Sequence, residues 1–274
     1  MNENPAIRKF KIFDSRLEIA ISGKALGDCH PKHEGGIRRI WQVGDFLGIG
    51  TILAPSLAFT NGAARFRQTD ILLKSSDWHD EALNFYRTKT SADGVWLDFP
   101  RPDWKYGLVI ANADCHVGVV YNPKTRAIMM LHLGLKCFCR DDGSDSILAQ
   151  ARQIGEFKDL WLWAGLGIGP CCNGYNLTVP ENAARAEKIR KEFGNGVIGA
   201  PLVAGPRKGQ ISFDNLGMIR AQALKLGFGK VQYDETCTSC HGLVDPNKRR
   251  GCTFFSNVRD WAKTNARNCV MVKY

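Results

Sequence analysis

Cys115 and His132 are the two residues whose types and spacing point most directly to chemistry. They lie on either side of two apolar, β-branched runs that are separated by Asn122-Pro-Lys-Thr125, a pattern that predicts a strand, a turn and a second strand. If the hairpin is symmetrical about Pro123-Lys124, Cys115 and His132 face each other with Cβ atoms roughly 5 Å apart. A thiolate and an imidazole at that distance can share a metal ion or act as nucleophile and base. A one-residue bulge would instead place them on opposite faces, and a buried Cys beside a core His is the structural alternative.

His79 is the residue that could complete a metal site with this pair. It lies in Asp77-Trp-His-Asp80, 36 residues before Cys115. Two His and one Cys would leave the fourth tetrahedral position open for water or substrate, which is typical of a catalytic zinc. A surface His beside two Asp is the structural alternative, because spacing alone does not bring so distant a residue to the hairpin.

Composition and charge indicate an ordinary globular protein. The chain has 274 residues, of which 44% are hydrophobic and 23% charged, and no apolar run reaches the roughly 18 residues of a membrane span. The N-terminal residues lack the apolar core of a signal peptide, so we expect a cytoplasmic protein. Its ten cysteines are then expected to be reduced thiols, available for metal binding or catalysis.

The net charge of +10 is spread along the chain. No basic tail or aromatic-interleaved basic stripe is present, so we expect no nucleic-acid partner. A small anionic ligand such as phosphate fits this charge, and so does a solvated basic surface.

The hydrophobic pattern predicts one α/β domain over residues 1–274, with a mixed or antiparallel sheet and helices packed on it. Residues 7–60 are interpreted as strands and turns, with the glycines at 35–36 and 48–50 as turn signals. Asp214 is expected to begin a helix that Gly227 ends. Strands are predicted over 17–22, 70–73, 94–97, 108–121, 127–131, 160–165, 230–233 and 268–272, and helices over 143–155, 180–193 and 214–226.

Five short motifs in order give the chain a resemblance to a known family. They are Ala113-Asp-Cys115, His132-Leu-Gly-Leu-Lys-Cys137, Gly165-Leu-Gly-Ile-Gly-Pro170, Cys237-Thr238 and Phe254-Phe-Ser-Asn-Val-Arg-Asp260. With them, the chain resembles the laccase-domain or YfiH-like proteins, once called multicopper polyphenol oxidases. The resemblance covers the sequence from about residue 79 to the C-terminus and implies a YfiH-like single domain, whereas residues 1–60 are less well matched.

The resemblance implies a zinc ion held by His79, Cys115 and His132, with copper less favoured. It also implies phosphorolysis of purine nucleosides (adenosine, inosine, guanosine or methylthioadenosine) with phosphate, deamination of adenosine, or, as in some bacterial members, editing of peptidoglycan precursors. Arg259 and Lys136 would attract the anionic substrate group. Two departures stand out: His79 is not in the family's Gln-Val-His-Gly, and Leu135-Lys136 replaces Trp-Arg, which loses the bidentate guanidinium fork.

Three other functions are open to the same residues. Cys115 and His132 could form a metal-independent amide hydrolase or acyl transferase, or the pocket could serve a non-catalytic, metal-binding regulatory protein. Copper oxidase chemistry is disfavoured, because the six His include no His-x-His pair. A monomer or homodimer is expected.

Cys237-Thr-Ser-Cys240-His241 is a separate cysteine motif. It spells a haem attachment sequence, which we set aside because no export signal accompanies it. Cys237 and Cys240 could instead supply half of a structural zinc site, together with Cys171, Cys172 or Cys252. The family's Cys-Thr element requires no metal, so unligated thiols are the alternative. Cys137 and Cys139 are interpreted as unligated thiols.

Overall fold

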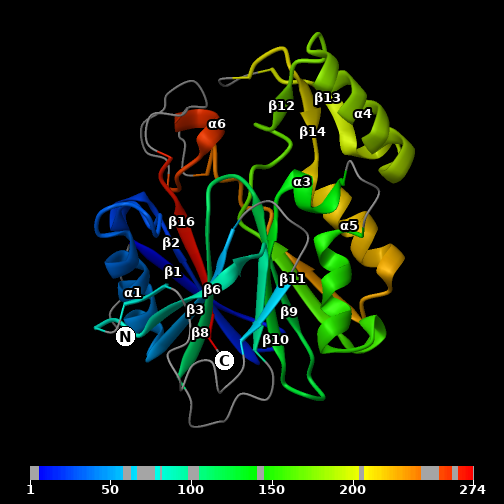
Figure 1. Cartoon of the computed structure of the whole chain (residues 1–274). Coiled ribbons are helices and arrows are strands. Elements are labelled where there is room, and N and C mark those ends of the chain that lie inside the picture. The colour runs from blue at the N-terminus through cyan, green and yellow to red at the C-terminus, as the bar shows by residue number, and fades with distance from the viewer. Residues whose placement is uncertain are drawn as a thin grey trace.

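A computed structural model describes residues 6–57, 63–66, 78–80, 82–97, 105–140, 145–203, 207–241, 253–260 and 265–273, with only the backbone at 78–80, 89, 138 and 259–260. Two large mixed sheets pack face to face, with helices on their outer faces (Figure 1). Sheet A has the order β1 (Ile7–Ile12), β2 (Leu17–Ser22), β16 (Asn268–Lys273), β8 (Tyr106–Asn112), β3 (Thr51–Ser56), β6 (Phe85–Ser91), β5 (Trp78–Asp80). Sheet B has the order β15 (Lys230–Tyr233), β11 (Trp161–Gly165), β9 (His116–Tyr121), β10 (Ile128–Leu133), β7 (Gly94–Leu97), β4 (Ala63–Phe66).

The side-chain alternation of the strands builds three layers of core. Leu108 and Ile110 of β8 pack with Val119 of β9 between the two sheets. Val109, between them in sequence, faces the other way and packs with Val43 of helix α1 (Gly36–Leu47). Sheet B is covered on its outer face by helix α5 (Asn215–Leu226) and the 3₁₀-helix η2 (Ile147–Ile154), whereas helix α4 (Pro180–Phe193) packs against residues 195–201. Strands β9 and β10 are therefore buried on both faces, which is why they are continuous apolar runs in the sequence.

The remaining elements are short. A three-stranded sheet has the order β12 (Gly174–Tyr175), β14 (Ile211–Phe213), β13 (Ile198–Pro201). The single-turn helices are η1 (Lys24–Leu26), α3 (Leu135–Phe138), η3 (Phe157–Asp159), η4 (Asn195–Val197) and α6 (Asn257–Asp260). Among the helices of the described residues, none combines the length and the apolar character needed to span a bilayer.

Local sequence signals predicted several elements correctly. Helix α5 begins where the Asp214 carboxylate accepts a hydrogen bond from the Gly217 N–H at 2.9 Å, and it ends at Gly227 in the left-handed conformation. The predicted helix over 180–193 is α4. The predicted helix over 143–155 is wrong in type, because residues 147–154 form the 3₁₀-helix η2 before Gly155. The predicted strand over 70–73 lies outside the described residues.

Helix α1 corrects the interpretation of residues 7–60 as strands and turns. Its glycines are at the two ends, with Gly35 and Gly48 both in the left-handed conformation. Ile40, Val43 and Leu47 recur at helical spacing and pack on sheet A. The two glycine clusters thus mark the limits of one helix.

The hairpin of β9 and β10 has a register that differs from the prediction by two residues. Val117, not Cys115, lies opposite His132. The turn is longer than expected, because Asn122 pairs with Ala127 (N to O, 2.9 Å) and Arg126 adopts a left-handed conformation with φ of 65°. A shift of two preserves the face on which each side chain lies, since side chains alternate along a strand. Cys115 and His132 therefore remain on the same face.

Candidate functional site

The functional residues lie where the chain passes from one sheet to the other. The predicted strand over 108–121 is two strands, β8 in sheet A and β9 in sheet B, and Asp114 interrupts them with φ of 74°. Cys115 directly follows this break. Asp93 lies in the second such crossover, between β6 and β7. Its carbonyl accepts a hydrogen bond from the His132 N–H at 2.7 Å, which brings the two crossovers together at the end of β10.

His132 is held between a carboxylate and a thiol. Its Nδ1 lies 2.7 Å from Asp93 Oδ1, and both side chains are buried. Gly134 makes room on the other side of the ring, since a Cβ added there would lie 3.4 Å from both His132 Nε2 and Cys115 Sγ. The structure therefore brings Cys115 and His132 together, as the hairpin predicted, and adds Asp93 as a third member.

The electrostatics of the site favour a charged imidazole. Burial disfavours the charged form, but the electrostatic effect of Cys115 and hydrogen bonds to Asp93, Cys115 and Cys137 outweigh it and hold the pKa of His132 well above 6.5. Cys115 and His132 are both of metal-ligand type, and a metal ion would take the place of a proton between them.

Cys137 is the nearest further ligand type. Its Sγ lies 3.9 Å from His132 Nδ1, and the side chains of Asp93, His132 and Cys137 lie close enough together to hold an ion. Burial raises the pKa of the Cys137 thiol, and Nδ1 already bonds to Asp93. We therefore assign Cys137 to packing beside the ring.

For three predicted site residues, the described atoms do not show a position beside Cys115 and His132. His79 has its backbone in β5, paired with Tyr86 of β6, and its side chain lies outside the described residues, so its role as a ligand stays a prediction. The same holds for the side chain of Arg259 in α6. Lys136, on α3, is exposed and does not line the cavity described next.

Cys115 and His132 line a cavity of about 250 Å³. This volume lies just below the range of about 300–1,000 Å³ typical of ligand sites, which favours a small ligand. Lys32, Arg87 and Arg267 line the same cavity. Burial lowers the pKa of Arg267, and the nearby Cys115 and Asp114 partly oppose this shift. The guanidinium therefore interacts electrostatically with the residues of the site.

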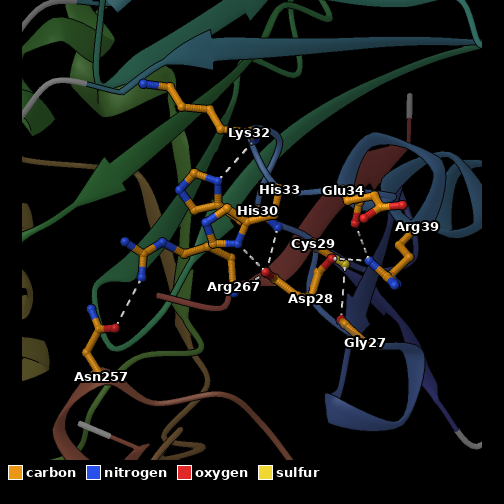
Figure 2. A network of polar contacts seen from close by, with 10 residues as sticks. All are labelled: Gly27, Asp28, Cys29, His30, Lys32, His33, Glu34, Arg39, Asn257 and Arg267. Atoms are coloured by element: carbon orange, nitrogen blue, oxygen red, sulfur yellow. Dashed lines mark hydrogen bonds and ion pairs between the residues drawn. The ribbon is translucent and has the colours of Figure 1, made fainter. Parts of the chain in front are cut away.

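The N-terminal segment supplies one wall of the cavity through a network centred on Asp28 (Figure 2). The Asp28 carboxylate accepts hydrogen bonds from the backbone N–H groups of His30 and Arg267, each at 2.8 Å, and contacts His33 Nδ1 at 2.5 Å. Burial and the neighbouring His33 and Arg267 lower the pKa of His30 to about 4, so it is a neutral imidazole at pH 7. This network holds His30 and Arg267 side by side at the cavity.

Asp114 anchors the backbone that carries Cys115. Its buried carboxylate accepts hydrogen bonds from Thr238 Oγ1 at 2.7 Å and from the Val258 N–H at 2.8 Å. Burial raises the pKa of Asp114, and these bonds together with one to Ser256 oppose the shift. Two segments distant in the sequence, around Thr238 and around Val258, therefore meet at the Ala113-Asp-Cys115 motif.

Sequence reasoning missed Asp93, Lys32, Arg87 and Arg267. The sequence contains one indication of Asp93. It lies in Ala92-Asp-Gly94, directly before an apolar strand, where a buried carboxylate requires a partner. The three cations are isolated in the sequence, and only the packing of β16, β6 and the 28–33 loop brings them to one cavity.

The donor set fits a zinc ion. Zinc takes Cys sulfur and His nitrogen, and a His ligand generally donates its second ring N–H to a carboxylate. Cys115, His132 and Asp93 stand in this relationship.

Comparisons with known proteins agree with this architecture. The family model described as "multi-copper polyphenol oxidoreductase laccase" matches residues 63–268. None of the curated proteins compared matches the chain. The crystal structure of the hypothetical protein YfiH from Bacillus licheniformis superposes with a TM-score of 0.72 at 18% identity, over 99% of this chain and 97% of that one.

Two further crystal structures share the fold. A Neisseria meningitidis protein of family DUF152 superposes with a TM-score of 0.67 at 15% identity, and each chain is covered to 98%. YlmD from Geobacillus stearothermophilus has a TM-score of 0.67 at 17% identity, over 94% of this chain and 91% of that one. These superpositions extend over N-terminal residues that the family model does not match.

Proposed function

Since this chain belongs to the multi-copper polyphenol oxidoreductase laccase family, we propose that it is a metal-dependent enzyme whose centre holds zinc and whose substrate is a purine nucleoside. The observation that carries the proposal is the Asp93–His132–Cys115 arrangement, with Asp93 and His132 buried and Cys115 half-buried, beside a cavity lined by three cationic side chains. His79 is the third protein ligand we expect. Copper is disfavoured, because Cys–His ligation with the six His of the chain and no His-x-His pair does not provide a multicopper centre.

Bound zinc would supply Lewis acidity, which lowers the pKa of a bound water toward about 7. Asp93 holds the His132 ring so that Nε2 is directed toward Cys115, and this orientation presents nitrogen and sulfur to one ion. His132 is buried and Cys115 is half-buried where it lines the cavity, so bulk water has little access to the ring. The protein's own contribution is thus a fixed pair of donors at the edge of a cavity.

The cations would bind the anionic co-substrate. Lys32, Arg87 and Arg267 line the cavity, and guanidinium groups suit the oxygens of phosphate. Pro55 and Leu57 add apolar surface to the same cavity, against which a purine ring can pack. Phosphorolysis would use phosphate from the cationic side, and deamination of adenosine would use the same donors with water in place of phosphate.

A metal-free thiol enzyme is the second function that a specific observation favours. Cys115, His132 and Asp93 also have the order of nucleophile, base and orienting acid. In that case the His132–Cys115 ion pair would be the active form: Cys115 Sγ would take the acyl group of an amide as the C–N bond breaks, and the amine would leave with the proton of His132.

Elemental analysis together with a nucleoside product assay separates these functions. We expect zinc in the purified protein, release of free purine base from adenosine or inosine with phosphate, and loss of both the hairpin-site zinc and turnover in Cys115→Ala and His132→Ala. Cys29→Ala, which removes a buried thiol outside the cavity, is the matched control. Full activity after removal of all metal would favour the thiol enzyme, and zinc binding without turnover on any nucleoside would favour a regulatory protein.

A further inference from the structure

Four cysteines from two distant segments meet at one end of sheet B. Cys171 and Cys172 follow β11, and Cys237 and Cys240 follow β15. Strands β11 and β15 are parallel neighbours, so their carboxyl ends lie at the same edge of the sheet. The four Sγ atoms all lie within 4.8 Å of one another, and those of Cys171 and Cys240 are 3.5 Å apart.

Backbone contacts hold the two cysteine loops in register. Gly167 pairs with Cys237 in an isolated parallel bridge, and its carbonyl accepts a hydrogen bond from the Thr238 N–H at 3.0 Å. The Gly169 N–H donates to Cys237 Sγ at 3.2 Å, a bond that favours the thiolate over the thiol. The loops are therefore shaped to present sulfur atoms toward one point.

We propose that Cys171, Cys172, Cys237 and Cys240 form a structural zinc site, separate from the Cys115–His132 centre. Zinc–sulfur bonds of about 2.3 Å place the sulfurs of a tetrahedral site roughly 3.8 Å apart, in agreement with the observed grouping. Four thiolate ligands fill the coordination shell and leave no position for substrate, so the site serves stability. Four thiols this close would repel one another when ionised, and a divalent cation removes that cost.

Other uses of the four sulfurs fit less well. Sulfurs gathered this closely enclose a single ion, and a cluster of several irons and sulfides needs wider spacing. All four cysteines are free thiols, and 3.5 Å exceeds the roughly 2.05 Å of a disulfide bond. The ring of His241 packs on Phe254 at 5.5 Å between centroids and is not a member of the group. Cys252 lies outside the described residues.

The proposed four-cysteine site is connected to the Cys115–His132 centre, called the hairpin centre below, through Asp114. The Ile168 N–H, in the first cysteine loop, donates to the Asp114 carbonyl at 2.7 Å. Thr238 Oγ1, between the two cysteines of the second loop, donates to the Asp114 carboxylate at 2.7 Å. A zinc ion that joins the two loops would thus also hold the backbone next to Cys115.

The test is zinc content and coordination in three variants of the full chain. We expect the Cys171→Ser/Cys240→Ser double variant to lose one zinc per chain relative to wild type and to melt at a lower temperature. Cys115→Ala should keep this zinc, with an X-ray absorption spectrum of four sulfur neighbours. Cys29→Ala/Cys269→Ala removes two neighbouring buried thiols elsewhere and should leave the zinc content unchanged.

The spectrum of Cys115→Ala keeps the proposal falsifiable if the double variant does not fold. A zinc-free Cys115→Ala protein, a zinc shell of nitrogen and oxygen only, an iron chromophore, or disulfides among these four cysteines would each overturn it. If the proposed function is wrong and the Cys115–His132 centre holds no zinc, wild type and Cys115→Ala would both contain only the zinc with four sulfur neighbours. The two proposals can therefore fail independently.

Discussion

The Nδ1 atom of His132 lies 2.7 Å from Oδ1 of Asp93, and neither side chain has appreciable contact with solvent. Because a carboxylate only accepts, this bond fixes the proton on Nδ1 and leaves Nε2 as the ligand or base. Asp93 therefore decides which nitrogen of the ring is available to Cys115 and a metal ion.

Replacement of Asp93 by Asn or Ala is expected to weaken zinc binding at the hairpin centre by about 10–100-fold, the usual effect of removing such a partner. A competition titration with a chromophoric chelator measures this. Asp45→Asn, on the exposed face of α1, is the control. Unchanged zinc affinity in Asp93→Ala would show that the carboxylate does not orient a metal ligand.

Arg267 is expected to bind the phosphate. Loss of a hydrogen bond to a charged group costs about 1.5–3 kcal/mol, so Arg267→Ala should raise the KM for phosphate roughly 10–100-fold. The KM for the nucleoside should change less, and Arg267→Lys should lie between, because Lys keeps the charge without the fork. Steady-state kinetics with each substrate varied in turn provides the comparison. A larger effect on the nucleoside than on phosphate would contradict this assignment.

Gly167 is required by close packing against His116. A Cβ at this position would lie 2.3 Å from the Cγ and Nδ1 atoms of the ring. We expect Gly167→Ala to lower the free energy of unfolding by about 1–3 kcal/mol, as overpacking does, in urea denaturation. Gly196→Ala is the matched control, since its Cβ meets nothing within 4 Å. Equal stabilities of the two variants would refute the packing argument.

His116 is expected to make stability depend on pH. The ring is buried, its Nδ1 has no hydrogen-bond partner among the described residues, and burial lowers its pKa to about 4. The unfolded chain takes up the proton near pH 6.5 and the native state only near pH 4. The unfolded state therefore binds more protons between these values, and the free energy of unfolding should fall by up to about 3 kcal/mol as pH drops through this window.

Urea denaturation at several pH values, with chelator present so that metal release does not contribute, measures this slope. His116→Gln should flatten it, and His241→Gln, at an exposed position, should not. An unchanged slope in His116→Gln would assign the pH dependence to other groups.

The sequence was most informative where local chemistry decides the structure. Asp214 and Gly227 bound α5 as expected, because a cap side chain and a left-handed glycine act within one turn. The proximity of Cys115 and His132 was also predictable, since the alternation of side chains survived a turn two residues longer than assumed.

Longer-range arrangements were not predictable. Helix α1 was missed because glycines at its two ends were interpreted as turns between strands. Asp93 reaches His132 only through the pairing of β7 with β10, and Arg267 reaches the cavity only because β16 inserts between β2 and β8. Such contacts depend on strand order, which no local pattern specifies.

The left-handed break at Asp114 has a consequence for how this architecture can diversify. Cys115 stands on the covalent connection shared by both halves of the sandwich, and Asp93 on another. Insertions in peripheral loops, or whole new N-terminal walls, can remodel the cavity without displacing these two side chains. The outer walls of the cavity and these two side chains therefore lie on separate parts of the chain, so the cavity can change shape while Cys115 and Asp93 keep their positions.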